Sequence, residues 1–297
     1  MNARLFMDIR PVETLMLGYF ALMAIIVYIS QERVTDCPAL LAGYAAAASF
    51  VLAARWAERR FPGNRPAALA RFAAPLLVLP FVYSAAADTV LVLHGRYLDD
   101  TVSAWETSLF GGLPNVLTGA VGFPPLTELL TLCYFSFYGC FLIPVLLYTR
   151  GRRALGERYL FAAMLTLLTC YLGFMAVPLA GPAAAAPELY AAYRPSGYVI
   201  TTLQGRIMAA FDPPGTCFPS PHVAGAWITL LCLRRHVTRN QRVALWALTS
   251  GLTAAVVYDW YHYVSDVAAG LAVALAAHAV AKRLSVRRER PRIPVPA

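Results

Sequence analysis

The sequence predicts an all-α membrane protein, a polytopic bundle of about eight transmembrane helices. Of its 297 residues, 59% are hydrophobic and only 14% are charged, whereas a soluble domain usually carries roughly 25% charged residues. The apolar runs are continuous and rich in Ala and Leu, so they lack the alternating pattern of a β-barrel. Basic residues gather in alternate connections between these runs, as they do in polytopic membrane proteins.

Each predicted span is a run of mainly apolar residues, and about 20 such residues cross a bilayer as a helix. The first run follows a basic start and has no small-residue cleavage site behind it, so it predicts a retained helix rather than a signal peptide. The sixth run would form a helix only roughly 20 Å long, which is shorter than the hydrocarbon core of about 30 Å. In chain order the predicted spans are residues 14–30, 38–54, 72–94, 124–148, 159–179, 221–233, 243–258 and 263–281.

The arginines predict the topology. They cluster before the first span, in the second–third, fourth–fifth and sixth–seventh connections, and after the last span. With eight crossings these segments share one side, which the positive-inside rule makes cytoplasmic. The outer side then holds two long connections, residues 95–123 and 180–220, and loops of such length usually serve a function. There we also expect an interfacial helix in residues 101–110 and an aromatic belt of Tyr258, Trp260, Tyr261 and Tyr263.

This topology divides the chain into three parts. Residues 1–60 form an N-terminal pair of transmembrane helices, residues 61–285 form a membrane core, and residues 286–297 form a basic, Pro-rich cytoplasmic tail. The net charge of +9 does not indicate nucleic-acid binding, because the basic residues are scattered between apolar runs. The six cysteines form no CxxC pair, which disfavours a structural zinc site. A disulfide between Cys37 and Cys217, both on the predicted outer side, is left open.

Two short segments carry the candidate chemistry, residues 217–224 and 261–270, and each places a histidine at the outer start of a predicted helix. His262 and Asp266 are four residues apart, so they share one helix face. The carboxylate can then accept a hydrogen bond from one imidazole nitrogen and leave the other free as a nucleophile or base. A buried structural His–Asp pair and a metal site formed by His222, His262 and Asp266 are the alternatives.

The pair Phe-Pro-Ser-x-His (residues 218–222) and His-Tyr-x-x-Asp-Val (residues 262–267) resembles the type 2 phosphatidic acid phosphatase superfamily. It is most similar to the inositol phosphorylceramide synthase and sphingomyelin synthase branch and its bacterial relatives. The resemblance implies a six-helix phosphatase-like core in which His262 attacks phosphorus to give a phosphohistidine, Asp266 orients it, and His222 is the acid and base. One departure is Val256, which stands where the phosphatases of the superfamily usually have an Arg.

These features together predict an integral membrane lipid phosphotransferase or phosphatase that acts on a lipid phosphoester at the outer membrane face. Ser220, Arg194 and Arg206 are the candidates for binding the substrate phosphate. We expect a phospholipid or sphingolipid substrate, no metal or other cofactor, and a bacterial inner membrane with the site on the periplasmic side. The alternative function is a non-catalytic lipid-binding protein or lipid transporter, which would place polar groups at several depths. Transfer and hydrolysis are both left open.

Overall fold

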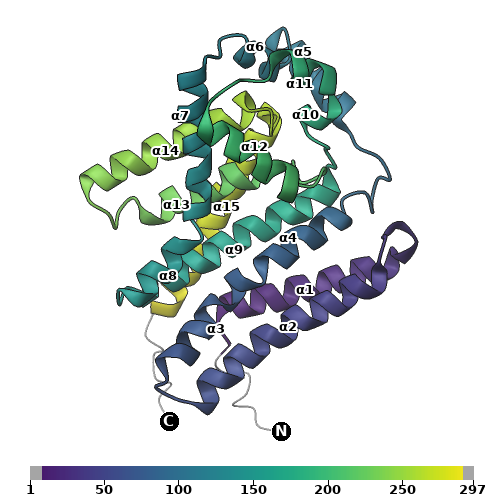
Figure 1. Cartoon of the computed structure of the whole chain (residues 1–297). Coiled ribbons are helices and arrows are strands. Elements are labelled where there is room, and N and C mark those ends of the chain that lie inside the picture. The colour runs from purple at the N-terminus through teal and green to yellow at the C-terminus, as the bar shows by residue number, and fades with distance from the viewer. Residues whose placement is uncertain (1–8, 290–297) are drawn as a thin grey trace.

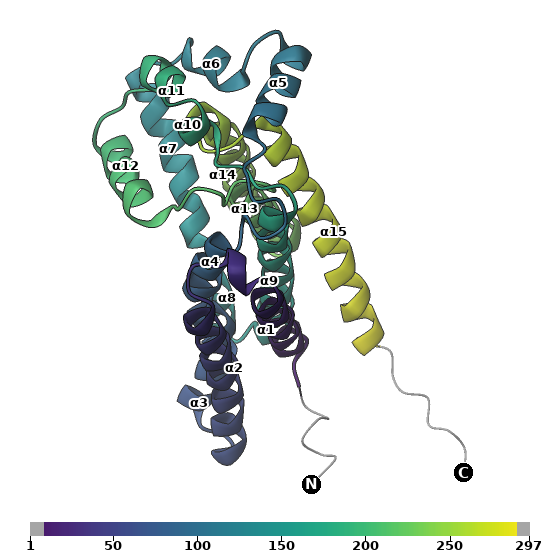
Figure 2. The same ribbon diagram turned by 90° about the vertical axis from the view of Figure 1, so that its right-hand side faces the viewer.

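The computed structural model describes residues 9–289, and side chains as far as residue 284. All regular structure in that part of the chain is helical, which confirms the predicted all-α membrane bundle. Helix α1 begins and helix α15 ends at one end of the bundle, and a cap of short helices covers the opposite end (Figures 1 and 2).

The N-terminal part consists of two antiparallel helices followed by a broken third span. A short 3-10 turn, Gln31–Arg33, joins α1 to α2. The third span, Arg65–Asp88, breaks into α3 and α4 near Val78, because Pro80 has no N–H to continue the helical ladder. It starts seven residues before the predicted run, and residues 89–94 form turns instead of helix. The four helices are α1 (Pro11–Ile29), α2 (Cys37–Arg60), α3 (Arg65–Leu77) and α4 (Leu79–Asp88).

A cluster of charged side chains, which we call the inner ion-pair cluster, joins the first three helices to the core. The Arg71 guanidinium donates to Glu13 at 2.5 Å and to Glu58 at 2.8 Å. Arg10 lies 3.3 Å from Glu58 and 3.8 Å from Glu157 at the start of α9. Glu13 and Arg71 are both buried, so the cluster neutralises charge that would otherwise be costly to bury.

The core is built around α13, which packs against α9, α14 and α15, while α7 packs against α14. Helices α7 and α8 form one span bent by 50°, and Pro144 lies one turn beyond the break, where it removes a helical hydrogen bond. The core helices are α7 (Pro124–Gly139), α8 (Leu142–Thr149), α9 (Arg153–Ala176), α13 (Pro221–Leu233), α14 (Arg239–Tyr258) and α15 (Val264–Glu289).

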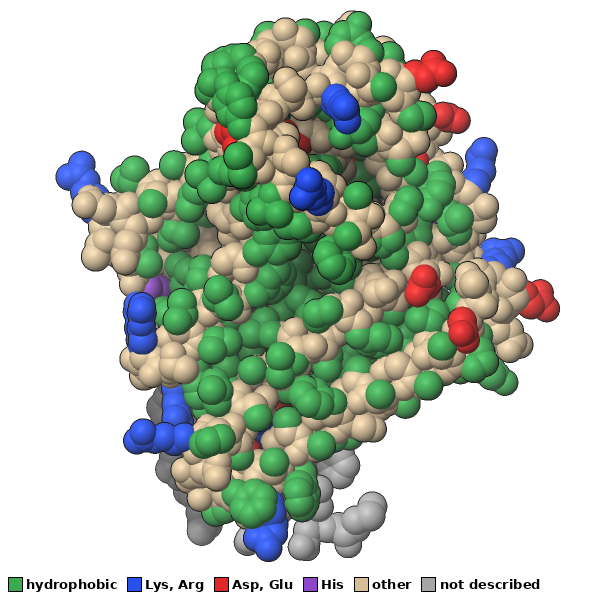
Figure 3. Space-filling model, in the orientation of Figure 1, with side chains coloured by type: hydrophobic (Ala, Val, Ile, Leu, Met, Phe, Trp, Pro, Cys, Tyr) green, Lys and Arg blue, Asp and Glu red, His purple; other side chains and the backbone are tan. Residues whose placement is uncertain are grey.

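The number of spans that length and composition support is smaller than eight within the described residues. Five helices are long and apolar enough to cross a membrane, or six if α7 and α8 count as one span. Helix α13 is apolar but has only 13 residues, as the sequence predicted, and α14 is not among the five. In Figure 3, basic side chains lie along the left and lower edges of the face, with others at the right edge and in the upper half, and hydrophobic side chains cover the middle.

The long connections fold into the cap. The helix expected in residues 101–110 appears as α5, and α12 stands beside α7 (Figure 2). The expected aromatic belt is wrong, because Tyr258, Trp260 and Tyr263 are buried among the cap helices and the core. The cap helices are α5 (Asp99–Phe110), α6 (Pro114–Gly119), α10 (Pro182–Ala185), α11 (Pro187–Tyr193) and α12 (Val199–Phe211).

Candidate active site

The two histidines predicted to act together face each other beneath the cap. His222 lies in the first turn of α13, and His262 lies in the turn between α14 and α15. The Nδ1 atom of His222 is 3.4 Å from the Nε2 atom of His262. On its other side, Nε2 of His222 is 2.8 Å from the hydroxyl of Tyr134 on α7. With a neutral His262 that carries its proton on Nδ1, Tyr134 donates to Nε2 of His222 and Nδ1 of His222 donates to Nε2 of His262.

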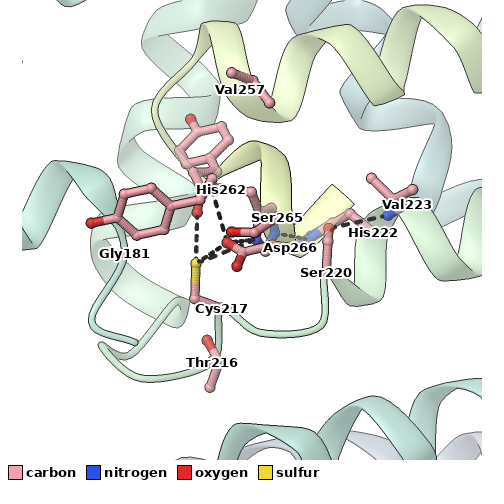
Figure 4. Close-up of polar contacts among 12 residues, drawn as sticks. Gly181, Thr216, Cys217, Ser220, His222, Val223, Val257, His262, Ser265 and Asp266 are labelled. Atoms are coloured by element: carbon pink, nitrogen blue, oxygen red, sulfur yellow. Dashed lines mark hydrogen bonds and ion pairs between the residues drawn. The ribbon is translucent and has the colours of Figure 1, made fainter. Parts of the chain in front are cut away.

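The third predicted residue, Asp266, completes this row. Its Oδ2 atom lies 3.4 Å from Nδ1 of His262 and accepts hydrogen bonds from the Tyr263 N–H at 2.8 Å and the Cys217 thiol at 2.9 Å (Figure 4). Asp266 is 0% exposed and His262 is 2% exposed. A carboxylate so placed fixes the imidazole tautomer and leaves Nε2 of His262 as the basic nitrogen that faces the cavity.

The start of α13 is held against α15 by backbone contacts. Ser220 caps α13, because its Oγ accepts from the Val223 N–H at 3.3 Å, and its own N–H donates to the Asp266 carbonyl at 3.0 Å. Gly270 lies directly against this turn, since a Cβ on it would come 2.6 Å from the Ser220 carbonyl oxygen. The absence of a side chain at residue 270 therefore sets how closely His222 can approach the helix that carries Asp266.

The turn that carries His262 is held from two sides. The N–H groups of Tyr261 and His262 both donate to the carbonyl of Val256, at 3.0 and 2.9 Å. From the cap, the Asn115 amide donates to the carbonyls of Val257 at 2.8 Å and His262 at 3.1 Å. Asn115 is fully buried, so it acts as a fixed support for the backbone of the turn.

Two acidic residues of the outer connection, which sequence reasoning placed there without a role, also hold the site. The Asp99 carboxylate accepts from the N–H groups of Ala180 and Gly181, at 2.8 and 3.0 Å, and from the Tyr263 hydroxyl at 3.1 Å. Glu106 accepts from the Ser265 N–H at 2.6 Å and so caps the start of α15. Both carboxylates are buried. In the sequence, this supporting role could have been inferred from the position of both acidic residues in a long connection that follows an apolar run.

Two adjoining cavities open next to the histidines. The first, of about 280 Å³, is lined by His222, His262, Cys217 and Asp212 among others. The second, of about 410 Å³, has mainly hydrophobic walls and also reaches Asp212 and His222. A hollow with hydrophobic walls is visible in the middle of the face in Figure 3. The pair of cavities offers a polar compartment beside the imidazoles and an apolar one continuous with it.

The family comparison covers the histidine pair and Asp266. Residues 100–280 match the family model of the PAP2 superfamily. The chain belongs to the PAP2 superfamily. No curated protein matches the chain, and no solved structure does. Membership of the PAP2 superfamily supports a phosphatase-type enzyme that acts on a lipid phosphoester in a membrane, and the long apolar helices make the chain an integral multi-pass membrane protein.

The three predicted phosphate-binding residues of this PAP2 protein lie in different settings. Ser220 is fully buried and its hydroxyl caps α13. Arg194, at the end of α11, and Arg206, in α12, are exposed, and neither is among the residues that line the two cavities. Asp212 lies in the wall of both cavities beside the Tyr83 and Thr216 hydroxyls, and desolvation there raises the pKa of its carboxyl above the ordinary value.

Cys217, which the sequence analysis considered only for a disulfide, belongs to the site. Both Cys37 and Cys217 are free thiols. The Cys217 thiol, His262 and Asp266 offer three possible metal-ligand atoms within 4.8 Å of one another, a set of the kind that zinc takes. His222 is not part of it. Burial and the charge of Asp266 raise the pKa of the Cys217 thiol well above its usual range, so a protonated thiol that donates to Asp266 fits the site.

Proposed function

We propose that this PAP2 protein transfers or hydrolyses the phosphoester of a membrane lipid through a phosphohistidine on His262. The observation that carries the proposal is the row of groups in which Asp266 faces Nδ1 of His262, and Nε2 of His262 faces His222 across 3.4 Å. A nucleophilic nitrogen, the group that orients it and an acid are therefore adjacent. The mechanism involves no metal.

In the first step Nε2 of His262 attacks the phosphorus of the lipid, and the bond from phosphorus to the leaving oxygen breaks. His222, in its imidazolium form, gives its proton to that oxygen. Asp266 stabilises the positive charge that develops on the ring of His262. Because the phosphoryl group enters between the two imidazoles, their mutual hydrogen bond must open when substrate binds.

In the second step neutral His222 takes a proton from an acceptor hydroxyl, which belongs to water for hydrolysis or to a second lipid for transfer. The resulting oxygen attacks phosphorus, and the phosphorus–nitrogen bond to His262 breaks. The imidazole suits both steps because its ordinary pKa of about 6.5 allows it to give and take a proton near neutral pH.

The two cavities support a lipid as the substrate. The apolar cavity has the character that acyl chains need, and it meets the polar cavity at His222 and Asp212. Helix α13 has only 13 residues, so a bilayer that surrounds it reaches beyond His222. A lipid can then enter sideways, with its chains in the apolar cavity and its phosphate beside the imidazoles.

The charge of the phosphate is met in this proposal by the imidazoles and by the start of α13, where the helix dipole favours an anion. We keep Arg194 and Arg206 as candidates for binding the phosphate at the mouth of the polar cavity. Arg206 lies on α12, just before Met208 and Ala209, which line that cavity. We also propose that the protein belongs to the synthase-like branch. Val256, where phosphatases of the superfamily usually have Arg, is 0% exposed and supports this placement.

The proposed location is a bacterial inner membrane with the histidines on the outer side and both ends of the chain inside. It is supported by the positive-inside pattern of the connections. A lipid transporter is disfavoured by Glu128, one of few acidic groups in the spans. Glu128 accepts from the N–H groups of Tyr198 and Ile200 and so caps α12, instead of lining a path.

The test is activity of the purified full-length protein on phosphatidic acid, polyprenyl diphosphate and phospholipid donors in the presence of a chelator. We expect turnover to persist with chelator, to be abolished in His262→Ala, and to fall steeply in His222→Ala. The control His94→Ala removes an exposed histidine outside the site and should stay active.

Quenching with labelled donor should trap phosphate on wild type and on His222→Ala, and none on His262→Ala. Turnover by a folded His262→Ala protein would refute the assigned nucleophile. Complete loss of turnover with chelator would favour a metal held by Cys217, His262 and Asp266.

A further inference from the structure

A third cavity, of about 310 Å³, lies at the far end of the core from the histidine pair. We call it the inner-end cavity. At 1.5 Å per residue, Arg234 lies about 18 Å from His222 along α13, and His278 lies about 18 Å from Asp266 along α15. The lining includes six basic or imidazole side chains, from Arg158, Arg234, Arg235, His236, His278 and Lys282.

The positive charge of the inner-end cavity is not neutralised by the side chains that the structure describes. None of its lining residues is acidic, and Arg158, Arg234 and Lys282 take part in none of the ion pairs between described residues. Arg158 instead lies 3.0 Å from Nε2 of His236, so this nitrogen accepts from the guanidinium. Desolvation, with the charges of Arg158 and Arg152, lowers the pKa of His236, in keeping with a positive potential.

The contrast with the inner ion-pair cluster is informative, because both lie at the same end of the bundle. There, three glutamates pair with Arg10 and Arg71. Glu157 lies beside Arg158 in the sequence but faces Arg10. The basic residues around the inner-end cavity are therefore left facing one another across an open space, an arrangement that an anion would stabilise.

We propose that the inner-end cavity binds a phosphate-bearing anion, either the headgroup of an anionic lipid or a soluble phosphate compound. Its volume of about 310 Å³ equals that of about ten waters at ~30 Å³ each, which is enough for a phosphate with several waters. Arginines on α9 and just after α13, together with a lysine on α15, supply the donors that phosphate oxygens prefer. Basic pockets between transmembrane helices have the chemistry that anionic headgroups require.

Such a ligand would hold the inner ends of α9, α13 and α15 together. At this depth α13 and α15 also pack through the buried Cys232, Ala277 and Ala281, and the Cys232 thiol lies 3.8 Å from Nδ1 of His278. A ligand that binds only the folded state raises its stability. The proposal does not depend on the reaction at His262, so its test needs no turnover measurement.

The experiment measures ligand binding and thermal unfolding of the full-length protein in detergent. One arm adds phosphatidylglycerol, with phosphatidylcholine as the neutral counterpart, and the other adds inorganic pyrophosphate. Native mass spectrometry counts bound lipid. The double variant Arg234→Gln/Lys282→Gln is compared with Arg239→Gln/Arg242→Gln, which removes the same charge from exposed positions of α14 outside the cavity.

We expect the first double variant to bind roughly 30-fold more weakly, at about fivefold for each charge, and the second to bind like wild type. Stabilisation by phosphatidylglycerol alone identifies a lipid headgroup, and stabilisation by pyrophosphate identifies a soluble ligand. Without ligand, the first variant should melt no lower than wild type, because it relieves repulsion. Equal weakening in both variants, or no stabilisation by either ligand, would overturn the proposal.

Discussion

The replacement Asp266→Asn tests the role of the carboxylate while it keeps the size of the side chain. The amide oxygen can still accept from the Tyr263 N–H and the Cys217 thiol, as the carboxylate does. An oxygen in the place of Oδ2 also lies against Nδ1–H of His262, so the tautomer of that ring is kept, and the NH₂ group takes the place of Oδ1. The exchange therefore removes the negative charge beside His262.

The expected loss follows from the distance. A unit charge on His262 and the Asp266 carboxylate, 3.4 Å apart, attract each other by about 5 kcal/mol at an effective dielectric constant of about 20. Because that charge develops during attack, losing it should lower kcat by roughly 10³- to 10⁴-fold. The variant should still fold, since the exchange leaves no charge buried at a position that is 0% exposed.

The assay is steady-state turnover on phosphatidic acid in mixed micelles, with thermal unfolding of each variant measured alongside. We expect kcat to fall and KM to change little, because Asp266 acts on the ring of His262 and not on the bound lipid. A folded Asp266→Asn protein whose kcat lies within tenfold of wild type would refute the reasoning. In that case the carboxylate would have a structural role only.

Three further predictions concern the groups around this pair. Cys217→Ala removes the hydrogen bond to the Asp266 carboxylate and should lower kcat about 10- to 100-fold. Cys217→Ser keeps a donor, so its kcat should lie within about fivefold of wild type. Equal loss of kcat in both variants would disprove a donor role. Gly270→Ala places a methyl group against the start of α13 and should cost about 1–3 kcal/mol of stability together with activity. The matched change Gly18→Ala, in open space on α1, should be neutral or slightly stabilising in the same unfolding assay. Burial raises the pKa of Asp259 from 3.8 to about 7, so the folded state keeps that proton while the unfolded chain loses it. The free energy of unfolding should therefore decrease as pH rises from 3.8 to about 7 and stay level above that. Asp259→Asn should remove up to about 4 kcal/mol of that decrease. If chemical unfolding of this variant shows the same pH dependence as wild type, the burial argument is contradicted.

The sequence could predict that the two histidines lie close together, because each step of the prediction used residue spacing or membrane topology. The four-residue spacing of His262 and Asp266 predicted one shared helix face; His262 lies in the turn just before α15 instead, but the same spacing still brings its ring to Asp266 in the first turn of that helix. The placement of His222 at the same end follows from the arginine pattern, which needs no knowledge of packing. The short sixth span also followed from residue count alone, since α13 begins at Pro221 and ends just before Arg234.

The supporting residues could not be predicted in the same way. Asp99, Glu106 and Asn115 reach the site from connections far away in sequence, and their side-chain directions depend on how the cap folds over the core. The prediction of an aromatic belt around His262 was wrong for the same reason. Trp260 adopts a left-handed backbone conformation in the turn and is 0% exposed beneath the cap, whereas composition alone favours an interfacial position for such residues.

The inner ion-pair cluster has a consequence for how the chain can be shortened. The family match starts at residue 100, so the first two helices look dispensable for catalysis. A protein that starts at residue 61 would lose Glu13 and Glu58 but keep Arg71, a guanidinium that is only 4% exposed. Removing carboxylate partners from a buried guanidinium typically costs about 3–5 kcal/mol, so the pair of helices and the catalytic core should be expressed and purified as one unit.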